Sequence, residues 1–340
     1  MNYNEFSAIN LKVLDDRFNT RAKLDTGTHC NYECSFCYYL DKLDVVTDVE
    51  VIKARAKKLY DFGMTEVDLS GGESSIHRNW FEILDYCREL GFKNISALTN
   101  GFKFANIDFL KKSQEHGLTE LLFSLHGWNS ESHAHIVKRK GSFEKMLEAI
   151  KNSQKLGIKV RLNCTVTSFN APHLEEYAEL VNSIAPFQMN FLPLNYWEDA
   201  QKVNPESYEF LSQHIKSAID LLDKKIEINV RYIPFCFMQG YEKYVVGIYQ
   251  HIYDRGDWNI IAYDVDRLPE KHATADDYFK RAKEQRVHSY TKPKKCFECK
   301  FFSICDGVEH KLANTQEVYP VLGDKITDVQ LFRRGHYPEC

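Results

Sequence analysis

The stretch from residue 21 to residue 37, RAKLDTGTHCNYECSFC, places three cysteines directly after a short apolar-rich run. The run Arg21–Thr28 ends in polar and glycine residues, as a buried parallel strand does. Cys30, Cys34 and Cys37 follow with the spacing C-x3-C-x2-C. Three thiolates on one tight loop suit an iron–sulfur cubane and leave one iron open to an outside ligand. The alternative interpretation is three buried or zinc-bound thiols, although a closed zinc site would need a fourth protein ligand.

The alternation of short apolar runs with amphipathic segments continues to residue 194. Five more runs predict strands: Glu66–Ser70, Asn94–Thr99, Glu120–Leu125, Lys159–Val166 and Phe187–Leu194. Four helical segments each stop at a glycine, which is typical of helix C-caps: Val49–Phe62, Trp80–Leu90, Ile107–His116 and Phe143–Leu156. Repeated strand–helix units predict a parallel sheet with right-handed crossovers. The predicted fold class is therefore α/β, a partial (β/α)6 barrel related to the TIM barrel.

Polar and glycine residues follow the predicted strands at the same end. The second strand leads into Gly71-Gly72-Glu73, the third into Thr99-Asn100-Gly101, and the fourth into Ser124-Leu125-His126-Gly127. In parallel α/β folds the chemistry lies at the C-terminal ends of the strands. We therefore expect these residues to form one site together with the cysteine loop.

Beyond about residue 195 the pattern changes. Residues 205–222 predict one more helix and Ile226–Ile233 a strand, after which periodicity is weak. A cysteine-rich segment with little regular structure is often organised by a metal. We place the domain boundaries at an N-terminal extension 1–20, a barrel 21–230 and a cysteine-rich module 231–340.

The second cysteine group lies in this module. Cys296, Cys299 and Cys305 have the spacing C-x2-C-x5-C and are followed by Asp-Gly, while Cys236 stands upstream in Ile-Pro-Phe-Cys. Four cysteines could hold one four-ligand cluster. A C-x2-C pair is also typical of zinc ribbons, so spacing alone leaves both metals open.

The motifs in their order resemble the radical S-adenosylmethionine (SAM) superfamily, whose loop is C-x3-C-x-aromatic-C, with Phe36 at the aromatic position. The resemblance implies a [4Fe–4S] cluster on the first cysteines and SAM chelated to the open iron. Reductive cleavage of SAM would release a 5′-deoxyadenosyl radical that takes a hydrogen atom from substrate. The SAM-binding residues it implies are Gly71, Gly72, Glu73, Asn100, Ser124, Asn163 and Leu192.

Two positions near that site carry alternatives. His126 stands where the family has Asp in S-L-D-G, so it either faces substrate as a catalytic residue or is structural. On the fifth strand, Arg161 and Asn163 share one face because side chains alternate, and Asn163 is expected to point into the barrel. Cys164 would then pack outward against helices rather than donate a hydrogen atom.

The second cysteine group resembles the SPASM and shorter twitch modules of radical SAM enzymes. Five cysteines follow residue 230, enough for one four-ligand cluster, and Cys236 is the expected fourth ligand because Cys340 is the terminal residue. The resemblance implies a second, auxiliary [4Fe–4S] cluster that acts as an electron relay. Zinc stays the alternative.

Composition narrows the class of protein. The 340 residues are 44% hydrophobic and 27% charged, with a net charge of −4, which gives no reason to expect nucleic acid or an anionic membrane surface as partner. No run approaches 18 apolar residues, and Met1–Asn10 lacks a secretory pattern. The expected location is the cytoplasm, where ten cysteines suggest metal ligands rather than disulfides.

The resemblance implies oxidation, epimerisation or bond formation on a small molecule or a peptide, with a flavodoxin or ferredoxin as reductant. Only about 20 residues precede the barrel, so we expect no leader-binding domain and favour a small molecule. The aromatic-rich stretch Phe235–Trp258 is expected to line the substrate mouth or to form the module core. One alternative is a nucleotide cyclase of the molybdenum-cofactor type, although the C-terminal Tyr337-Pro-Glu-Cys340 lacks that family's double-glycine tail. The other is a non-catalytic iron–sulfur or zinc scaffold.

Overall fold

The computed structural model describes residues 18–194, 206–270 and 272–334. The terminal Cys340 and most of the predicted N-terminal extension lie outside these residues. The first residue of the helix predicted from position 205 lies outside them as well.

In the described part of the chain, seven parallel strands form a single sheet in chain order, which confirms the predicted α/β partial barrel. Their bounds are β1 (Arg21–Asp25), β2 (Glu66–Ser70), β3 (Asn94–Thr99), β4 (Glu120–Ser124), β5 (Lys159–Val166), β6 (Gln188–Pro193) and β7 (Glu227–Val230). The sequence predicted six strands in the barrel. The seventh pairs in parallel with β6, so the run at Ile226–Ile233 extends the barrel sheet.

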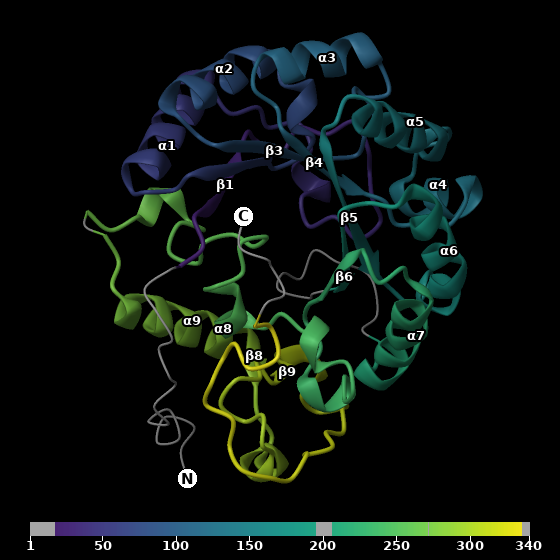
Figure 1. The fold of residues 1–340 in the computed structure, drawn as a ribbon, viewed down its shortest axis with the longest axis vertical. Coiled ribbons are helices and arrows are strands. Elements are labelled where there is room, and N and C mark those ends of the chain that lie inside the picture. Colours follow the sequence, from purple (N-terminus) through teal and green to yellow (C-terminus); the bar gives the residue numbers. More distant parts are fainter. Residues whose placement is uncertain (1–17, 195–205, 271, 335–340) are drawn as a thin grey trace.

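Helices cover the outer face of this sheet (Figure 1). They are α1 (Val49–Asp61), α2 (Trp80–Leu90), α3 (Ile107–Glu115), α4 (Ser130–Val137), α5 (Ser142–Lys155), α6 (Leu174–Ile184) and α7 (Tyr208–Leu221). Gly91 ends α2 with φ of 102°, a conformation that costs other residues energy. Alternate strand residues such as Leu69, Phe123 and Leu162 are fully buried in the layer between sheet and helices.

The chain after β7, described over residues 231–270 and 272–334 and called here the C-terminal segment, lies between the first and last strands of the sheet. Beside β7, the Val246 N–H donates to the Val230 carbonyl at 2.9 Å, and beside β1 the Asn259 N–H donates to the Arg21 carbonyl at 2.7 Å. The C-terminal segment therefore covers both edge strands, β1 and β7. Covered edge strands are protected from pairing with strands of other molecules. In Figure 1 this part lies opposite β3 and β4.

Buried charges fill the amino-terminal end of the barrel interior. Arg21 pairs with Asp68 at 2.6 Å, and Arg161 pairs with both Asp68 and Glu120. Burial alone would raise the pKa of Glu120, but Arg161 and Arg21 lower it to about 2. This network of buried ion pairs occupies one end of the barrel interior.

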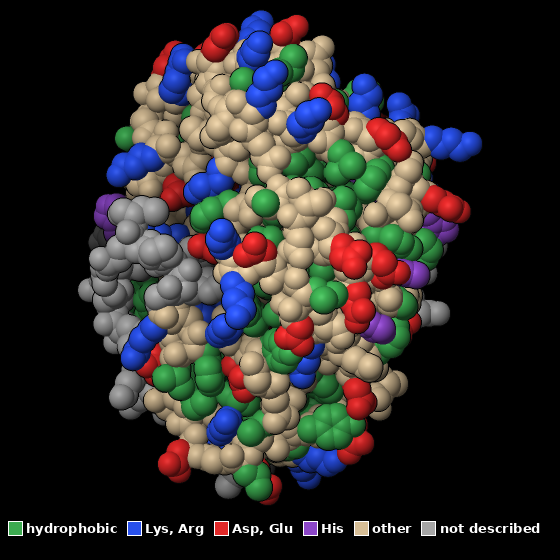
Figure 2. All heavy atoms as spheres, turned by 45° about the vertical axis from the view of Figure 1, so that its right-hand side comes forward, with side chains coloured by type: hydrophobic (Ala, Val, Ile, Leu, Met, Phe, Trp, Pro, Cys, Tyr) green, Lys and Arg blue, Asp and Glu red, His purple; other side chains and the backbone are tan. Residues whose placement is uncertain are grey.

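The remaining elements belong to the cysteine-rich region. They are α8 (Ile248–His251), α9 (Ala275–Ser289) and the antiparallel pair β8 (Tyr290–Thr291) and β9 (Val308–Glu309). Among the described residues, no helix has the length and apolar character that crossing a membrane requires. Lys and Arg side chains lie among Asp and Glu side chains over the face shown in Figure 2.

Candidate active site

The loop after β1 carries Cys30, Cys34 and Cys37 and rests on the end of α4. The Ser35 N–H donates to the Ile136 carbonyl at 2.9 Å, and the Cys37 N–H donates to the Cys34 carbonyl at 2.9 Å. Burial is the main cause that raises the pKa of Cys30 to about 11, and Glu73 and Cys37 contribute to the rise. The pKa of the Cys34 thiol is raised by burial and, to a smaller extent, by Cys30 and Cys37. The three thiols thus lie on one loop, where Cys37 raises the pKa of the other two, and three thiolates on one loop are a donor set that suits an iron–sulfur cluster.

The glycine pair after β2 presses against the backbone of the cysteine loop. The Gly72 N–H donates to the Gly27 carbonyl at 2.9 Å, and the Glu73 N–H donates to the His29 carbonyl at 2.8 Å. A Cβ at Gly71 or Gly72 would collide with carbonyl oxygens of residues 27–29. The two glycines thus permit close approach to the chain that leads into Cys30. Their contact with SAM stays a prediction.

Glu73 joins the ends of β2 and β3. Its carboxylate accepts from the Thr99 hydroxyl at 2.8 Å and from the Asn100 N–H at 2.6 Å, and the residue is 3% exposed. Burial raises its pKa, which these hydrogen bonds partly offset. Asn100 in turn donates to Asn31 Oδ1 at 2.8 Å and lies 4.0 Å from Cys30 Sγ. Glu73 therefore organises the residues that surround the cluster loop, and its predicted bond to the SAM ammonium remains to be tested.

His126 packs against the cysteine loop through Phe36. Its ring meets Phe36 edge-on with 4.9 Å between centroids, and its Nδ1 accepts from the Thr165 N–H at 3.1 Å. Burial, and then His133, lowers its pKa to about 3, so the ring is neutral. The His126 side chain is therefore buried and packed against its neighbours. A substrate role for His126 stays a prediction.

Three further predicted SAM contacts lie at the strand ends. Ser124 on β4 is the register partner of Asn163 on β5, and both are partly exposed, as is Leu192 on β6. Cys164 is fully buried on the opposite face of β5, as side-chain alternation predicted. Asn163 accordingly faces the barrel interior.

The second cysteine group also converges. Cys236, Cys296, Cys299 and Cys305 line one small cavity of about 20 Å³ together with apolar residues such as Phe301. Burial, with a smaller contribution from the other thiols of the group, raises the pKa of Cys236 and of Cys296 to about 12. The structure thus brings Cys236 to a group 60 residues away in the chain. Their role as ligands stays a prediction.

Within the described ranges, no three His, Cys, Asp or Glu side chains are arranged to hold a single metal ion. The choice between an iron–sulfur cluster and zinc at the second cysteine group stays a prediction.

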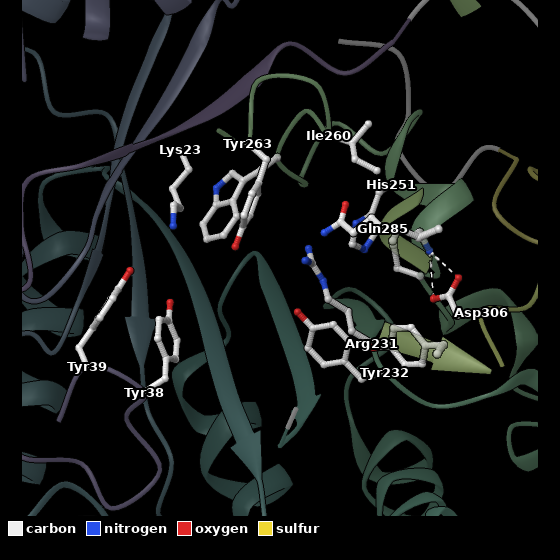
Figure 3. Close-up of a pocket in the computed structure, with 14 residues that line it drawn as sticks. Lys23, Tyr38, Tyr39, Arg231, Tyr232, His251, Ile260, Tyr263, Gln285 and Asp306 are labelled. Carbon is white, nitrogen blue, oxygen red and sulfur yellow. Dashed lines mark hydrogen bonds between the residues drawn. The ribbon is translucent and has the colours of Figure 1, made fainter. Parts of the chain in front are cut away.

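A cavity of about 490 Å³ lies between the barrel and the cysteine-rich region (Figure 3). Its size is that of a small-molecule site. The lining residues come from both parts of the chain: Lys23, Tyr38, Tyr39, Arg231, Tyr232, Val246, Ile248, His251, Trp258, Ile260, Tyr263, Gln285, Tyr290 and Asp306. Tyr38 and Tyr39 follow Cys37 directly, and Asp306 follows Cys305. Residues next to both cysteine groups in the chain therefore line this cavity.

The cations of this cavity have partners within the chain. Lys23 Nζ lies 3.0 Å from Asp25 and 5.0 Å from the centre of the Tyr263 ring. Arg231 forms an ion pair with Asp257. Burial, and then Arg231, lowers the pKa of His251 to about 3. The cavity is thus aromatic and polar, with its positive charges balanced.

The sequence located only part of this lining. The sequence predicted that the stretch Phe235–Trp258 lines the site or forms the core. Some of its residues, such as His251 and Trp258, line the cavity, whereas Phe235 is buried in the core. Tyr38 and Tyr39 were not predicted, although their place after Cys37 was a usable signal. Lys23 was also missed, because it required knowing which strand face points inward.

Comparison with known proteins agrees with this geometry. Residues 24–181 match the family described as the Radical SAM superfamily. The match runs from β1 into α6 and includes the cysteine loop and the motifs after β2, β3 and β4. This part of the chain is a radical SAM domain. A domain of this kind implies a [4Fe–4S] cluster and SAM.

Curated relatives are distant. A probable GTP 3′,8-cyclase of Saccharolobus islandicus is 29% identical over 181 residues, which is 50% of this chain and 56% of the relative. The subtilosin biosynthesis protein AlbA of Bacillus subtilis is 32% identical over 163 residues, 46% of this chain and 36% of AlbA. The chain thus spans 56% of the cyclase and 36% of AlbA.

Solved structures share the fold. The structure titled native anSMEcpe with bound AdoMet and Cp18Cys peptide has a TM-score of 0.58 at 16% identity, covering 89% of this chain and 92% of its own. SuiB of Streptococcus suis bound to precursor peptide SuiA has a TM-score of 0.51 at 17% identity, covering 60% and 46%. At such identities the likeness concerns the fold alone.

Proposed function

We propose that this protein cleaves SAM reductively at a [4Fe–4S] cluster on Cys30, Cys34 and Cys37 and removes a hydrogen atom from a substrate in the 490 Å³ cavity. One observation carries the proposal. The cavity is lined by Tyr38, next to the first cysteine group, and by Asp306, next to the second. A substrate held there would lie between the source of the radical and an electron acceptor.

The chain's own residues would hold SAM at the strand ends. The proposed contacts are Gly71, Gly72, Glu73, Asn100, Ser124, Asn163 and Leu192. The Gly71–Glu73 backbone is clamped to the cysteine loop, and Glu73 fixes Asn100. A flavodoxin or ferredoxin would supply the electron that SAM cleavage consumes.

We assign Cys236, Cys296, Cys299 and Cys305 to an auxiliary [4Fe–4S] cluster in a SPASM- or twitch-like module, residues 231–340. When bound, this cluster would accept one electron from the substrate after the hydrogen atom has left, while a proton is released to solvent. The net reaction is a two-electron oxidation of substrate. Four thiolates would ligate all four irons, so no iron would be open to the substrate and the cluster would act by electron transfer alone.

The substrate class follows from the size and lining of the cavity. Its 490 Å³ accommodates a small molecule or one side chain of a peptide. AlbA and SuiB are distant neighbours whose names and titles concern a bacteriocin and a precursor peptide. We favour a small polar molecule, such as an alcohol, sugar or cyclitol, with a peptide side chain as the other possibility.

Nucleotide cyclisation is the second candidate, because the curated relatives include probable GTP 3′,8-cyclases. A triphosphate carries several negative charges and needs an excess of cations. In the cavity Lys23 and Arg231 are each paired with a carboxylate. The balance of charge therefore favours the first proposal.

The test is an anaerobic assay of the reconstituted protein with SAM and dithionite, in separate reactions with and without GTP. We expect 5′-deoxyadenosine and methionine in both, with GTP recovered intact. Conversion of GTP would establish the cyclase. Intact SAM in a protein with full iron content would favour a non-catalytic scaffold.

A further inference from the structure

Three asparagines on neighbouring strands form a hydrogen-bonded row on the inner face of the barrel. Asn163 on β5, Asn190 on β6 and Asn229 on β7 are register partners. Asn229 Nδ2 donates to Asn190 Oδ1 at 3.1 Å, and Asn190 Nδ2 donates to Asn163 Oδ1 at 2.8 Å. Arg333, from the C-terminal segment, donates to Asn229 Oδ1 at 2.8 Å.

Arg333 fixes the direction of this row. A guanidinium can only donate hydrogen bonds, so Asn229 must turn its oxygen toward Arg333 and its nitrogen toward Asn190. The same constraint passes to Asn190 and then to Asn163. Asp254 holds Arg333 in place at 2.8 Å, with both side chains buried. The oxygen and nitrogen of an asparagine amide are usually hard to tell apart. Here the guanidinium of Arg333 decides their orientation, because it can only donate hydrogen bonds.

The row leaves one donor at its end. Asn163 Oδ1 is used by Asn190, and among the described residues nothing accepts from Asn163 Nδ2. Asn163 is partly exposed beside Ser124, its register partner on β4. Its amide N–H groups therefore face the barrel interior and suit a ligand atom that accepts.

We propose that Arg333 is a positioning residue that acts through Asn229 and Asn190 to present Asn163 as a hydrogen-bond donor to an oxygen of SAM. This inference rests on the proposed function, because it requires SAM to bind at the strand ends. SAM carries acceptor oxygens on its carboxylate and its ribose. A residue 104 positions away from Asn229 in the chain would thereby set the polarity of the cofactor site.

SAM affinity is the measurement that tests this proposal. Equilibrium dialysis of the anaerobically reconstituted protein without reductant measures Kd before any cleavage. Asn163→Asp keeps the bond from Asn190 but replaces the free donor with an acceptor, so we expect binding weaker by about tenfold or more. Asn229→Asp cannot donate to Asn190, so the row should reverse and Asn163 should present its oxygen. A similar weakening is expected, although Asn163 itself is unchanged.

Variants at Arg333 separate positioning from structural support. Arg333→Lys still only donates and should bind SAM within about threefold of the wild type, whereas Arg333→Met should bind several-fold more weakly. Arg334→Met is the matched control, since Arg334 is on the same segment but pairs with Asp328 at the surface. Its affinity should be unchanged.

Two results would overturn the proposal. One is wild-type affinity in Asn163→Asp or Asn229→Asp protein that retains full iron content. The other is equal weakening by Arg333→Lys and Arg333→Met with normal circular dichroism. Failure of the wild-type protein to bind SAM would instead remove the proposed function itself.

Discussion

Tyr38, the residue after Cys37, and Asp306, the residue after Cys305, line the same cavity although 268 positions separate them in the chain. Figure 3 shows the tyrosine and the aspartate at opposite ends of the group of lining residues. The C-terminal segment bonds to both edge strands of the barrel, so Tyr38 and Asp306 line one cavity. Residues next to each cysteine group in the chain therefore meet around the cavity that we propose as the substrate site.

The first prediction concerns iron content. Anaerobically reconstituted wild-type protein should hold about eight irons per chain in two [4Fe–4S] clusters, and replacing Cys30, Cys34 and Cys37 with Ala should leave about four. Cys87→Ala is the control, because Cys87 is buried in α2 and belongs to neither cysteine group. Elemental analysis that finds four irons and one zinc in the intact protein would disprove the auxiliary cluster while leaving the first one standing.

Glu73 gives a second prediction. Glu73→Ala removes the acceptor for the Thr99 hydroxyl and the Asn100 N–H, which are then left buried without it. Glu73→Ala also removes the proposed carboxylate partner of the SAM ammonium, and losing a charged hydrogen-bond partner costs about 1–3 kcal/mol, so SAM affinity should fall at least about tenfold. Equilibrium dialysis checks this, with the exposed Glu82→Ala as control. Unchanged affinity would make Glu73 an ordinary loop residue.

The third prediction separates the two clusters by function. Cys299→Ala should leave SAM cleavage measurable while product formation collapses, because the electron from substrate has no acceptor. Loss of a cluster can also unfold its module, since metal binding and folding are linked. Circular dichroism and the SAM cleavage rate serve as controls. A folded Cys299→Ala protein with full product turnover would show that the second group is structural.

Glu227 predicts a pH dependence of stability. Burial, and then Asp254, raises its pKa from 4.5 to about 7. A carboxyl whose pKa is raised on folding prefers its protonated form in the folded state, so stability is lost as pH rises from about 4.5 through 7. Glu227→Gln should therefore unfold at a similar urea concentration at pH 5 but resist unfolding by about 1–2 kcal/mol more at pH 8. The exposed Glu89→Gln variant should show no such difference between the two pH values.

Local patterns were enough to predict most of the barrel. Strands such as Glu66–Ser70 and Lys159–Val166 have the predicted bounds, because short apolar runs and helix-ending glycines are local signals. The prediction of six strands was incomplete because a four-residue strand, β7, carries no sign of its pairing partner. The short helix α4 was also not predicted individually, since eight residues give a weak periodicity.

The site could be predicted only where its residues share a motif. The cysteine groups and the motifs after β2, β3 and β4 are contiguous in sequence. The asparagine row depends on strand register and on Arg333, 104 positions from its partner Asn229. Long-range hydrogen bonds of this kind leave no local pattern. The balanced charge of the cavity also required the pairing of Arg231 with Asp257 to be seen.

The most direct measurement of the central claim follows hydrogen transfer from substrate to the SAM-derived radical. Reduced protein is incubated with SAM and with metabolite and peptide fractions from cells grown in heavy water, and the 5′-deoxyadenosine is weighed by mass spectrometry. The account predicts 5′-deoxyadenosine one mass unit heavier with at least one fraction, and none at all from the Cys30, Cys34 and Cys37 triple variant. Absence of 5′-deoxyadenosine from fully iron-loaded wild-type protein, or its undiminished formation by the triple variant, would contradict the account.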